Sequence, residues 1–276
     1  MIAAVVINYR NEERTVRFVR EELSKISSPH GVVVVDNGST PESAAKLREG
    51  LPEGCKVLEM KENAGFARGN NAGAELFPDA DFYLFANNDI VFTDPDVADV
   101  LAARLAGLPD YGVIGPKVAG PDGSLQSPYP YRSFRQRHID IYWSNLFMSR
   151  ARHREKFETV PERDEGPCYQ VSGCFFMVRG ADWRACGGMD PHTFLYAEEG
   201  ILAERMKRTG KGEWYCPAVS VLHEHEATTA RYFDARKRRE MAFESDCYYY
   251  RTYMGTPRRQ IAFAKFTYFL KRLFRR

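Results

Sequence analysis

Short runs of β-branched and aromatic residues that end in polar turn residues constrain the fold of this chain more than any other feature. Val32–Val35 leads directly into Asp36–Ser39, and Phe82–Phe85 leads into Ala86–Asp89. Apolar runs of this length, closed by Asn, Asp and Gly, are typical of buried strands in a parallel sheet. Because ligands bind at the carboxyl ends of such strands, these polar residues predict a binding site at one edge of an open α/β sheet.

Expected strands and helices alternate along the first half of the chain. The strands are Ile2–Ile7, Val32–Val35, Lys56–Met60, Asp81–Ala86 and Val113–Val118. The helices are Glu12–Ser24, Pro41–Gly50, Phe66–Phe77 and Val97–Leu108. This β-α-β-α order predicts an α/β fold with a Rossmann-like, doubly wound and mostly parallel sheet.

The second half is less regular. Residues 119–168 are rich in proline, aromatic and basic residues, so we expect a long excursion with some helix near Ile139–Met148. A strand is expected at Val171–Val178 and a helix at Tyr196–Thr209. Two short extended pieces are expected at Trp214–Cys216 and Val219–Leu222.

Composition adds limits on the setting of the protein. Of 276 residues, 44% are hydrophobic and 28% are charged, which is ordinary for a soluble globular protein. The six cysteines include no Cys-x-x-Cys pair, which argues against a zinc knuckle or a thioredoxin-type site. The apolar start of the chain has no basic region before it, and no apolar run is long enough to span a bilayer. These features predict a reducing, cytoplasmic setting without a signal peptide.

Two polar clusters are candidates for binding a nucleotide. Asn8–Glu12 and Asp36–Ser39 follow the first two strands, where a carboxylate can accept the imide N–H of a pyrimidine and its neighbours can hold a ribose. Glu62–Gly73 begins with a glycine-containing turn before a helix, where Arg68 could reach a phosphate. The alternative interpretation of both clusters is ordinary turn and capping residues.

Three further motifs are candidates for catalysis or metal binding. Asp89, at the end of Asn87–Asp89, offers oxygen ligands for a hard divalent cation. Glu198 and Glu199 begin a helix, where one carboxylate could act as a general base and both could simply favour the helix dipole. In His223–His225 the two histidines share one face of an extended segment, which suits metal or phosphate contact but is also common in purely structural positions.

Taken in order, these motifs resemble family 2 glycosyltransferases of the GT-A fold, especially the rhamnosyl- and galactosyltransferase-like branch. The resemblance extends roughly from Ile2 to His225. It is carried by Val5–Tyr9, Val34–Ser39, Glu62–Asn71, Asn87–Asp89, Val171–Gly173, Phe194–Glu199 and His223–His225. It implies inverting transfer of a sugar from a nucleotide-diphosphate donor, of dTDP-rhamnose or UDP-hexose type, to a glycan or lipid-linked acceptor in cell-surface polysaccharide synthesis.

The resemblance also implies roles for single residues. Asp36 would lie beside the base, and Asn63, Gly65 and Arg68 along the ribose and diphosphate. Asp89 would bind Mg²⁺ or Mn²⁺ with His223 as a second ligand, although Asn87 replaces the first acid of the family's Asp-x-Asp motif. Glu199 would be the general base beside Glu198. The remaining donor-site candidates are Asn8, Arg10, Asn37, Ser39, Phe66, Asn71, Asn87 and Asn88.

The chain divides by these motifs into three parts. We expect a nucleotide-sugar half at 1–118, an acceptor-binding and catalytic half of the same domain at 119–230, and a helical segment at 231–276. Residues 257–276 carry seven basic and no acidic residues, whereas the rest of the chain is mildly acidic.

On a helical wheel the tail places its phenylalanines on one face and most of its basic residues on the other. The apolar face holds Ala262, Phe263, Phe266, Phe269, Leu270, Leu273 and Phe274. This pattern predicts peripheral association with the anionic inner face of the cell membrane. The alternative is a helix that packs on the catalytic domain or on a second copy of the chain in a homo-oligomer.

Two other function classes compete with an active transferase. The weakened metal motif would also suit a catalytically weak nucleotide-sugar-binding protein. The basic tail could bind nucleic acid, but one of its faces is apolar and the chain carries no recognised nucleic-acid module, so no nucleic-acid partner is expected.

Overall fold

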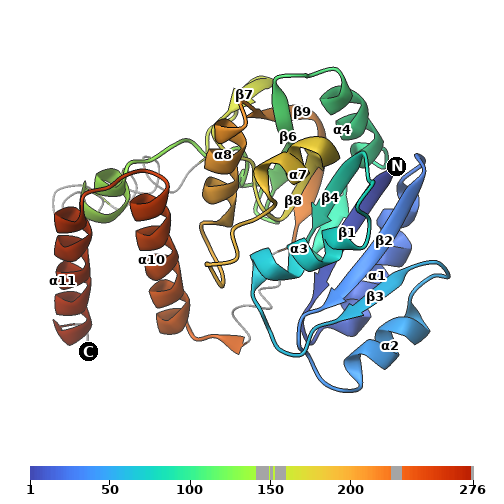
Figure 1. The fold of residues 1–276 in the computed structure, drawn as a ribbon, viewed down its shortest axis with the longest axis horizontal. Coiled ribbons are helices and arrows are strands. Elements are labelled where there is room, and N and C mark those ends of the chain that lie inside the picture. The colour runs from blue at the N-terminus through green and yellow to red at the C-terminus, as the bar shows by residue number, and fades with distance from the viewer. Residues whose placement is uncertain (141–148, 150–151, 153–159, 225–231, 275–276) are drawn as a thin grey trace.

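The computed structural model describes residues 1–140, 149, 152, 160–224 and 232–274. The first part of the chain forms four parallel strands with helices between them (Figure 1). Its elements are β1 (Ile2–Asn8), α1 (Glu12–Glu21), η1 (Leu23–Lys25), β2 (His30–Asp36), α2 (Ser43–Gly50), β3 (Lys56–Glu59), α3 (Phe66–Glu75) and β4 (Phe82–Ala86). The alternation predicted from the sequence is therefore confirmed.

The remainder of the chain completes the sheet and adds helices at the carboxyl end. Its strands are β5 (Ile90–Phe92), β6 (Tyr111–Ala119), β7 (Gly166–Cys168), β8 (Phe175–Arg179) and β9 (Gly212–His223). Its helices are α4 (Val97–Ala106), the short π-helix η2 (Gln136–Asp140), α7 (Gly180–Cys186), α8 (Glu198–Arg208), α10 (Ala235–Thr252) and α11 (Arg258–Phe274).

One nine-stranded sheet runs through the molecule in the order β3-β2-β1-β4-β8-β6-β9-β5, with β7 paired to β9. Strands β1 to β4 are mutually parallel, and β8 is antiparallel to β4. The register brings Asn8 beside Asp36, and β9 pairs with β5 so that His223 lies beside Ile90. The sheet therefore gathers at one edge several polar residues that are far apart in the sequence.

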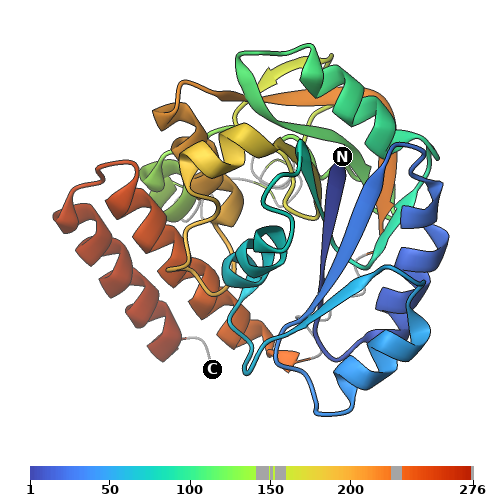
Figure 2. The ribbon, with the colours of Figure 1, turned by 45° about the vertical axis from the view of Figure 1, so that its right-hand side comes forward.

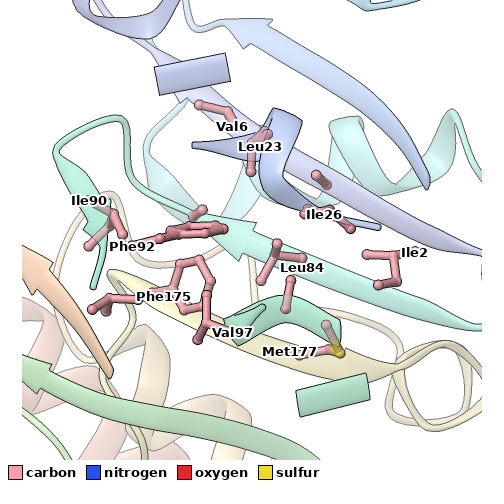
Figure 3. Close-up of a cluster of buried hydrophobic side chains, with 14 of the residues drawn as sticks. Ile2, Val6, Leu23, Ile26, Leu84, Ile90, Phe92, Val97, Phe175 and Met177 are labelled. Carbon is pink, nitrogen blue, oxygen red and sulfur yellow. The ribbon is translucent and has the colours of Figure 1, made fainter. Parts of the chain in front are cut away.

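Helices cover both faces of the sheet, as Figure 2 shows. Alternate residues of β1 explain this arrangement, because Ala4 and Val6 belong to one buried cluster and Ala3 and Val5 to the other. The first cluster joins β1 and β4 to α1 and α4, and the rings of Phe92 and Phe175 within it meet edge to face (Figure 3). Burial of each such side chain stabilises the fold by about 1.5–3 kcal/mol.

Helices α10 and α11 pack beside each other at the end of the molecule farthest from β2 and β3 (Figure 1). A third buried cluster attaches them to α8 and to the residues just before η2. It contains Phe134, Ile201, Cys247, Tyr249, Tyr250, Ile261 and Ala264. The tail predicted from the sequence to be an amphipathic helix is thus α11. It packs on the rest of the protein through Ile261 and Ala264.

Several predicted elements differ from the structure. The pieces expected at Trp214–Cys216 and Val219–Leu222 belong to one strand, β9, and most of the helix expected near Ile139–Met148 lies outside the described residues. Two later starts have clear reasons. The strand expected from Val171 begins only at Phe175, because the preceding backbone N–H groups bond to side chains: that of Val171 to Glu213 and that of Gly173 to Glu199. The helix expected from Tyr196 begins at Glu198, because Tyr196 and Ala197 adopt left-handed conformations with φ of 75° and 67°.

Candidate active site

A cavity of about 530 Å³ opens at the polar edge of the sheet. Five of the residues selected from the sequence line it, although they come from four separate parts of the chain: Phe66, Asn87, Glu198, Glu199 and His223. A pocket of this size with convergent polar groups is a common form of small-molecule site. Among the donor-side candidates, Phe66 and Asn87 line the cavity, and the others are described below.

Asp36 is held in place by a network of neutral side chains. It is 4% exposed and accepts hydrogen bonds from Asn8 Nδ2, at 3.0 Å, and from Ser39 Oγ. Asn8 is fully buried and accepts a further hydrogen bond from Thr15 Oγ1 at 2.8 Å. Asn8 therefore orients the Asp36 carboxylate through its hydrogen bond. Because the Asn8 side chain is fully buried, it has no exposed surface that could contact a ligand.

Asn37 ties the end of β2 to the turn before α3. Its Nδ2 donates to Asn63 Oδ1 and to the carbonyl of Gly65, both at 3.1 Å, and its Oδ1 accepts from Ala64 N at 3.0 Å. Both the Nδ2 donor and the Oδ1 acceptor of this amide therefore form hydrogen bonds within the protein. It fixes the turn against the strand end.

Gly65 lets this turn touch the loop that leads to α8. Its φ is 88°, and a Cβ atom there would lie 2.2 Å from the carbonyl oxygen of Phe194. The next N–H, of Phe66, donates to the same oxygen at 3.0 Å. Only glycine fits both the conformation and the close approach.

Two candidates on α3 contact the same loop and do not line the cavity. Arg68 Nε donates to the carbonyl of Pro191 at 3.0 Å. Asn71 exchanges two hydrogen bonds with the backbone of Met189, at 2.8 and 2.9 Å. In this structure both side chains position the loop before Glu198, and their roles in donor binding stay predictions.

The Arg10 side chain is exposed at the surface of the protein. Its guanidinium carbon is 5.3 Å from the ring centre of Tyr9 and 5.4 Å from that of Tyr232, within the range of cation–π contacts. Its backbone N–H donates to Ser39 Oγ at 2.9 Å. The aromatic contacts bring the start of the C-terminal segment over the end of β1.

Asp89 and His223 form the candidate metal site. Asp89 is 9% exposed, and its Oδ1 has no hydrogen-bond partner among the described residues. His223 Nε2 lies 3.2 Å from that oxygen, an ion-pair distance without hydrogen-bond alignment, and its Nδ1 contacts Gln126 Oε1 at 2.8 Å. Although burial opposes the charged imidazole, Asp89 and Cys174 raise the pKa of His223 to about 10.

A buried carboxylate oxygen that lies 3.2 Å from an imidazole nitrogen supplies two groups that can serve as ligands on one side of a divalent-cation site. The described residues contain no cluster of three or more His, Cys, Asp or Glu side chains that could hold a metal ion. Asn88 Nδ2 donates to Thr15 Oγ1 at 2.8 Å, and the role of Asn88 in donor binding stays a prediction. His225 lies outside the described residues.

Glu198 and Glu199 differ in their surroundings. Glu198 is 5% exposed, whereas Glu199 keeps partial exposure to the cavity. Burial raises the pKa of both carboxyls, and the charge of Glu199 raises that of Glu198 further. The Gly173 N–H, at 3.2 Å, and the charge of Arg137 favour ionised Glu199. A carboxylate with a raised pKa and cavity access is suited to accept a proton.

Sequence reasoning missed several residues of this region, of which Glu213 is the most deeply placed. It is 3% exposed, and its Oε2 accepts the N–H of Val171 at 2.8 Å, two residues before Gly173. Burial raises its pKa to about 8. The available signal was an acidic residue beside Trp214–Cys216, a run predicted to be a short extended piece. Gln126 and Arg137 carried no comparable signal.

Comparison with known proteins agrees with this geometry. Residues 4–184 match the family model described as Glycosyl transferase family 2. An N-acetylglucosaminyl-diphospho-decaprenol L-rhamnosyltransferase of Mycobacterium tuberculosis, found in two strains, is 26% identical over 246 residues. The match covers 84% of this chain and 78% of that protein.

Two solved structures share the fold. The structure of GalNAc-T7 with UDP, GalNAc and Mn²⁺ aligns with a TM-score of 0.59 and 14% identity. The alignment covers 83% of this chain and 44% of that chain. The mannosyltransferase PcManGT from Pyrobaculum calidifontis, in complex with GDP-Man and Mn²⁺, aligns with a TM-score of 0.58 and 14% identity over 96% of this chain and 68% of that one. The GT-A fold predicted from the sequence is thereby confirmed.

Replacing Glu213 with Gln is expected to flatten the dependence of stability on pH. The pKa is about 8 in the folded protein and about 4.3 in an unfolded chain. Between these values the folded state binds the extra proton, so the free energy of unfolding of the wild type falls as pH rises. Gln imitates the protonated carboxyl and does not titrate.

Urea unfolding across this pH window measures the effect. Glu213→Gln should gain stability relative to the wild type toward the alkaline end. Glu162→Gln is the control, since that side chain is 73% exposed and paired with Lys117. Parallel curves for Glu213→Gln and the wild type would show that Glu213 is ionised throughout.

Proposed function

We propose that this chain, which belongs to glycosyl transferase family 2, transfers a sugar with inversion from a nucleotide-diphosphate donor. The proposed donor is of dTDP-rhamnose or UDP-hexose type. The proposed acceptor is a glycan or a lipid-linked molecule in cell-surface polysaccharide synthesis. The protein is a glycosyltransferase; the identity of donor and acceptor is the proposal. The observation that carries it is one cavity lined both by Glu199 and by His223, which lies 3.2 Å from Asp89.

Residues 1–118 supply the donor site in this proposal. The Asp36 carboxylate, oriented by Asn8 and Ser39, accepts the imide N–H of a pyrimidine base. The turn at Asn63–Gly65 follows the ribose and diphosphate. Neutral partners around Asp36 leave its charge uncompensated, which strengthens its hydrogen bond to a base.

Asp89 and His223 would hold a divalent cation, Mg²⁺ or Mn²⁺. Asp89 supplies an oxygen ligand, and His223 binds when its ring is neutral. Such a cation offsets the negative charge that develops on the leaving diphosphate.

Glu199 acts as the general base on the acceptor side. It accepts the proton of the attacking hydroxyl while that oxygen bonds to the anomeric carbon from the face opposite the diphosphate, which produces inversion. Gly173 makes this position accessible, because a Cβ atom there would lie 2.5 Å from Glu199 Oε1. Holding both substrates in line supplies much of the remaining acceleration.

Asp89→Asn is expected to weaken metal-dependent donor binding and to lower turnover sharply, because an amide is a poorer ligand than a carboxylate. The measurement is nucleotide-sugar binding and turnover as functions of Mn²⁺ concentration. Unchanged turnover at limiting Mn²⁺ would remove Asp89 from the site. Donor binding without any turnover in the wild type would favour the nucleotide-sugar-binding alternative.

Glu199→Gln is expected to lower kcat by about 10²–10⁴-fold while donor affinity survives, because Gln keeps the shape but cannot accept the proton. The matched control is Glu198→Gln, the neighbouring buried carboxyl. Steady-state kinetics and donor titration separate the two effects. An active Glu199→Gln beside an inactive Glu198→Gln would reverse their assignment.

Helix α11 is the proposed membrane-docking element and would place the protein peripherally on the inner face of the membrane. Phe263, Phe266 and Phe269 are 50%, 58% and 55% exposed, whereas Ile261 and Ala264 are buried toward the third cluster. Large exposed apolar side chains gathered on one helix mark an interaction surface. None of the helices in the described part of the chain is long and apolar enough to cross a bilayer.

Replacing Phe263, Phe266 and Phe269 together with Ser should abolish sedimentation with anionic vesicles, since each buried Phe contributes about 1.5–3 kcal/mol and each nearby basic residue about 1 kcal/mol. The same three positions changed to Leu are the control and should retain binding. Donor binding should survive in both variants. Persistent vesicle binding by the Ser variant would place the membrane surface elsewhere, with Tyr129–Arg154 the next candidate.

A further inference from the structure

Two arginines line the catalytic cavity outside the motifs that led to the family. Arg132 and Arg137 come from the segment that contains η2 and border the same cavity as Glu199. Arg137 Nε donates to Asp246 Oδ2 of α10 at 2.7 Å, and Asp246 is 4% exposed. The Arg137 side chain nevertheless keeps 47% of its surface exposed. A buried carboxylate thus anchors a guanidinium that remains accessible.

The two guanidinium groups lie close enough for their charges to interact. Burial and the positive charge of Arg137 both lower the pKa of Arg132. Asp246 serves Arg137 and also lies 3.1 Å from His138 Nε2. Among the described residues, Arg137 uses only Nε of its guanidinium in hydrogen bonds, so its terminal nitrogens can meet a ligand. Guanidinium groups placed in this way favour a bidentate anion such as a phosphate.

The arginines and the proposed donor site come from opposite ends of the molecule. Figure 1 shows η2, coloured yellow-green, beside α10 and α11, whereas β1 to β3 lie at the other end. Glu199 connects these two sides of the cavity. It accepts from Gly173, whose neighbour Cys174 accepts the N–H of Asn87 at 2.8 Å, and it also interacts with the charge of Arg137.

We propose that Arg132 and Arg137 bind the phosphate or diphosphate group of the acceptor, in the cavity that Glu199 also lines. The inference rests on the proposed function and extends it to an anionic, lipid-diphosphate type of acceptor. The same cavity is lined by Tyr129, whose partly exposed ring suits contact with a sugar placed between the arginines and the base.

The proposed subsite packs against α10 and α11. Helix α11 also carries the exposed phenylalanines. Phe134 lies between the two arginines in sequence, is 2% exposed, and packs edge-on against Tyr250 of α10 with ring centres 5.4 Å apart. Ile261 and Ala264 of α11 belong to the same cluster. A diphosphate attached to a membrane-embedded chain would therefore meet the arginines close to the surface on which α11 docks.

The test uses farnesyl diphosphate as a probe, titrated calorimetrically into the full-length protein. Arg132→Gln should weaken its binding roughly 10- to 100-fold, as expected for a lost charge-assisted contact. Because Arg137→Gln would leave Asp246 unpaired, Arg137→Gln/Asp246→Asn is the second variant, with the same expected loss. Arg135→Gln is the matched control, since Arg135 lies in the same segment with its side chain 73% exposed and paired with Asp140.

Two further measurements distinguish the source of the phosphate. If the arginines bind the acceptor, saturating nucleotide diphosphate should leave farnesyl diphosphate binding intact, and the variants should lose the preference in kcat/KM for a phosphorylated acceptor over its alkyl glycoside. Competition between the two diphosphates, or a raised KM for the donor in the variants, would assign the arginines to the donor and overturn the proposal.

Equal affinity of the wild type and both variants for farnesyl diphosphate would also overturn it. The binding measurement requires no turnover. A wild type that transfers no sugar would therefore refute the proposed function, while the titration would still decide whether this anion subsite exists.

Discussion

The contact between the turn before α3 and the loop before α8 is the constraint on which the rest of the site depends. It consists of the close approach of Gly65 to the Phe194 carbonyl, continued by the bonds of Arg68 to Pro191 and of Asn71 to Met189. Through these contacts one helix fixes the distance between the proposed donor-binding strands and the carboxyl pair. In the proposed function two substrates must be held in line, and this connection would contribute to that alignment.

The second organising feature is the burial of carboxyl groups behind the cavity. Glu198, Glu199 and Glu213 all have pKa values raised by desolvation, and Glu199 and Glu213 each accept a backbone N–H from Val171–Gly173. That segment is therefore held by side chains instead of by a neighbouring strand. Arg137 favours ionisation of Glu199, which distinguishes it from the more deeply buried Glu198.

The C-terminal helices connect the proposed membrane surface to the proposed acceptor subsite. Helix α11 contributes Ile261 and Ala264 to the cluster that holds Phe134, while α10 supplies Asp246 to Arg137. The same packing that leaves Phe263, Phe266 and Phe269 exposed thus also positions the arginines. Membrane docking and acceptor binding would be properties of one structural unit.

The sequence alone determined the alternation of strands and helices, because side-chain periodicity and turn chemistry are local. It also determined the family, because the ordered motifs need no coordinates to be recognised. Tertiary structure decided which polar residues share a cavity: Phe66, Asn87, Glu199 and His223 meet there, whereas Arg68 and Asn71 turn toward a loop. It also revealed Glu213 and Arg137, since burial and the charge of a distant neighbour depend on the packing of segments that are far apart in the chain.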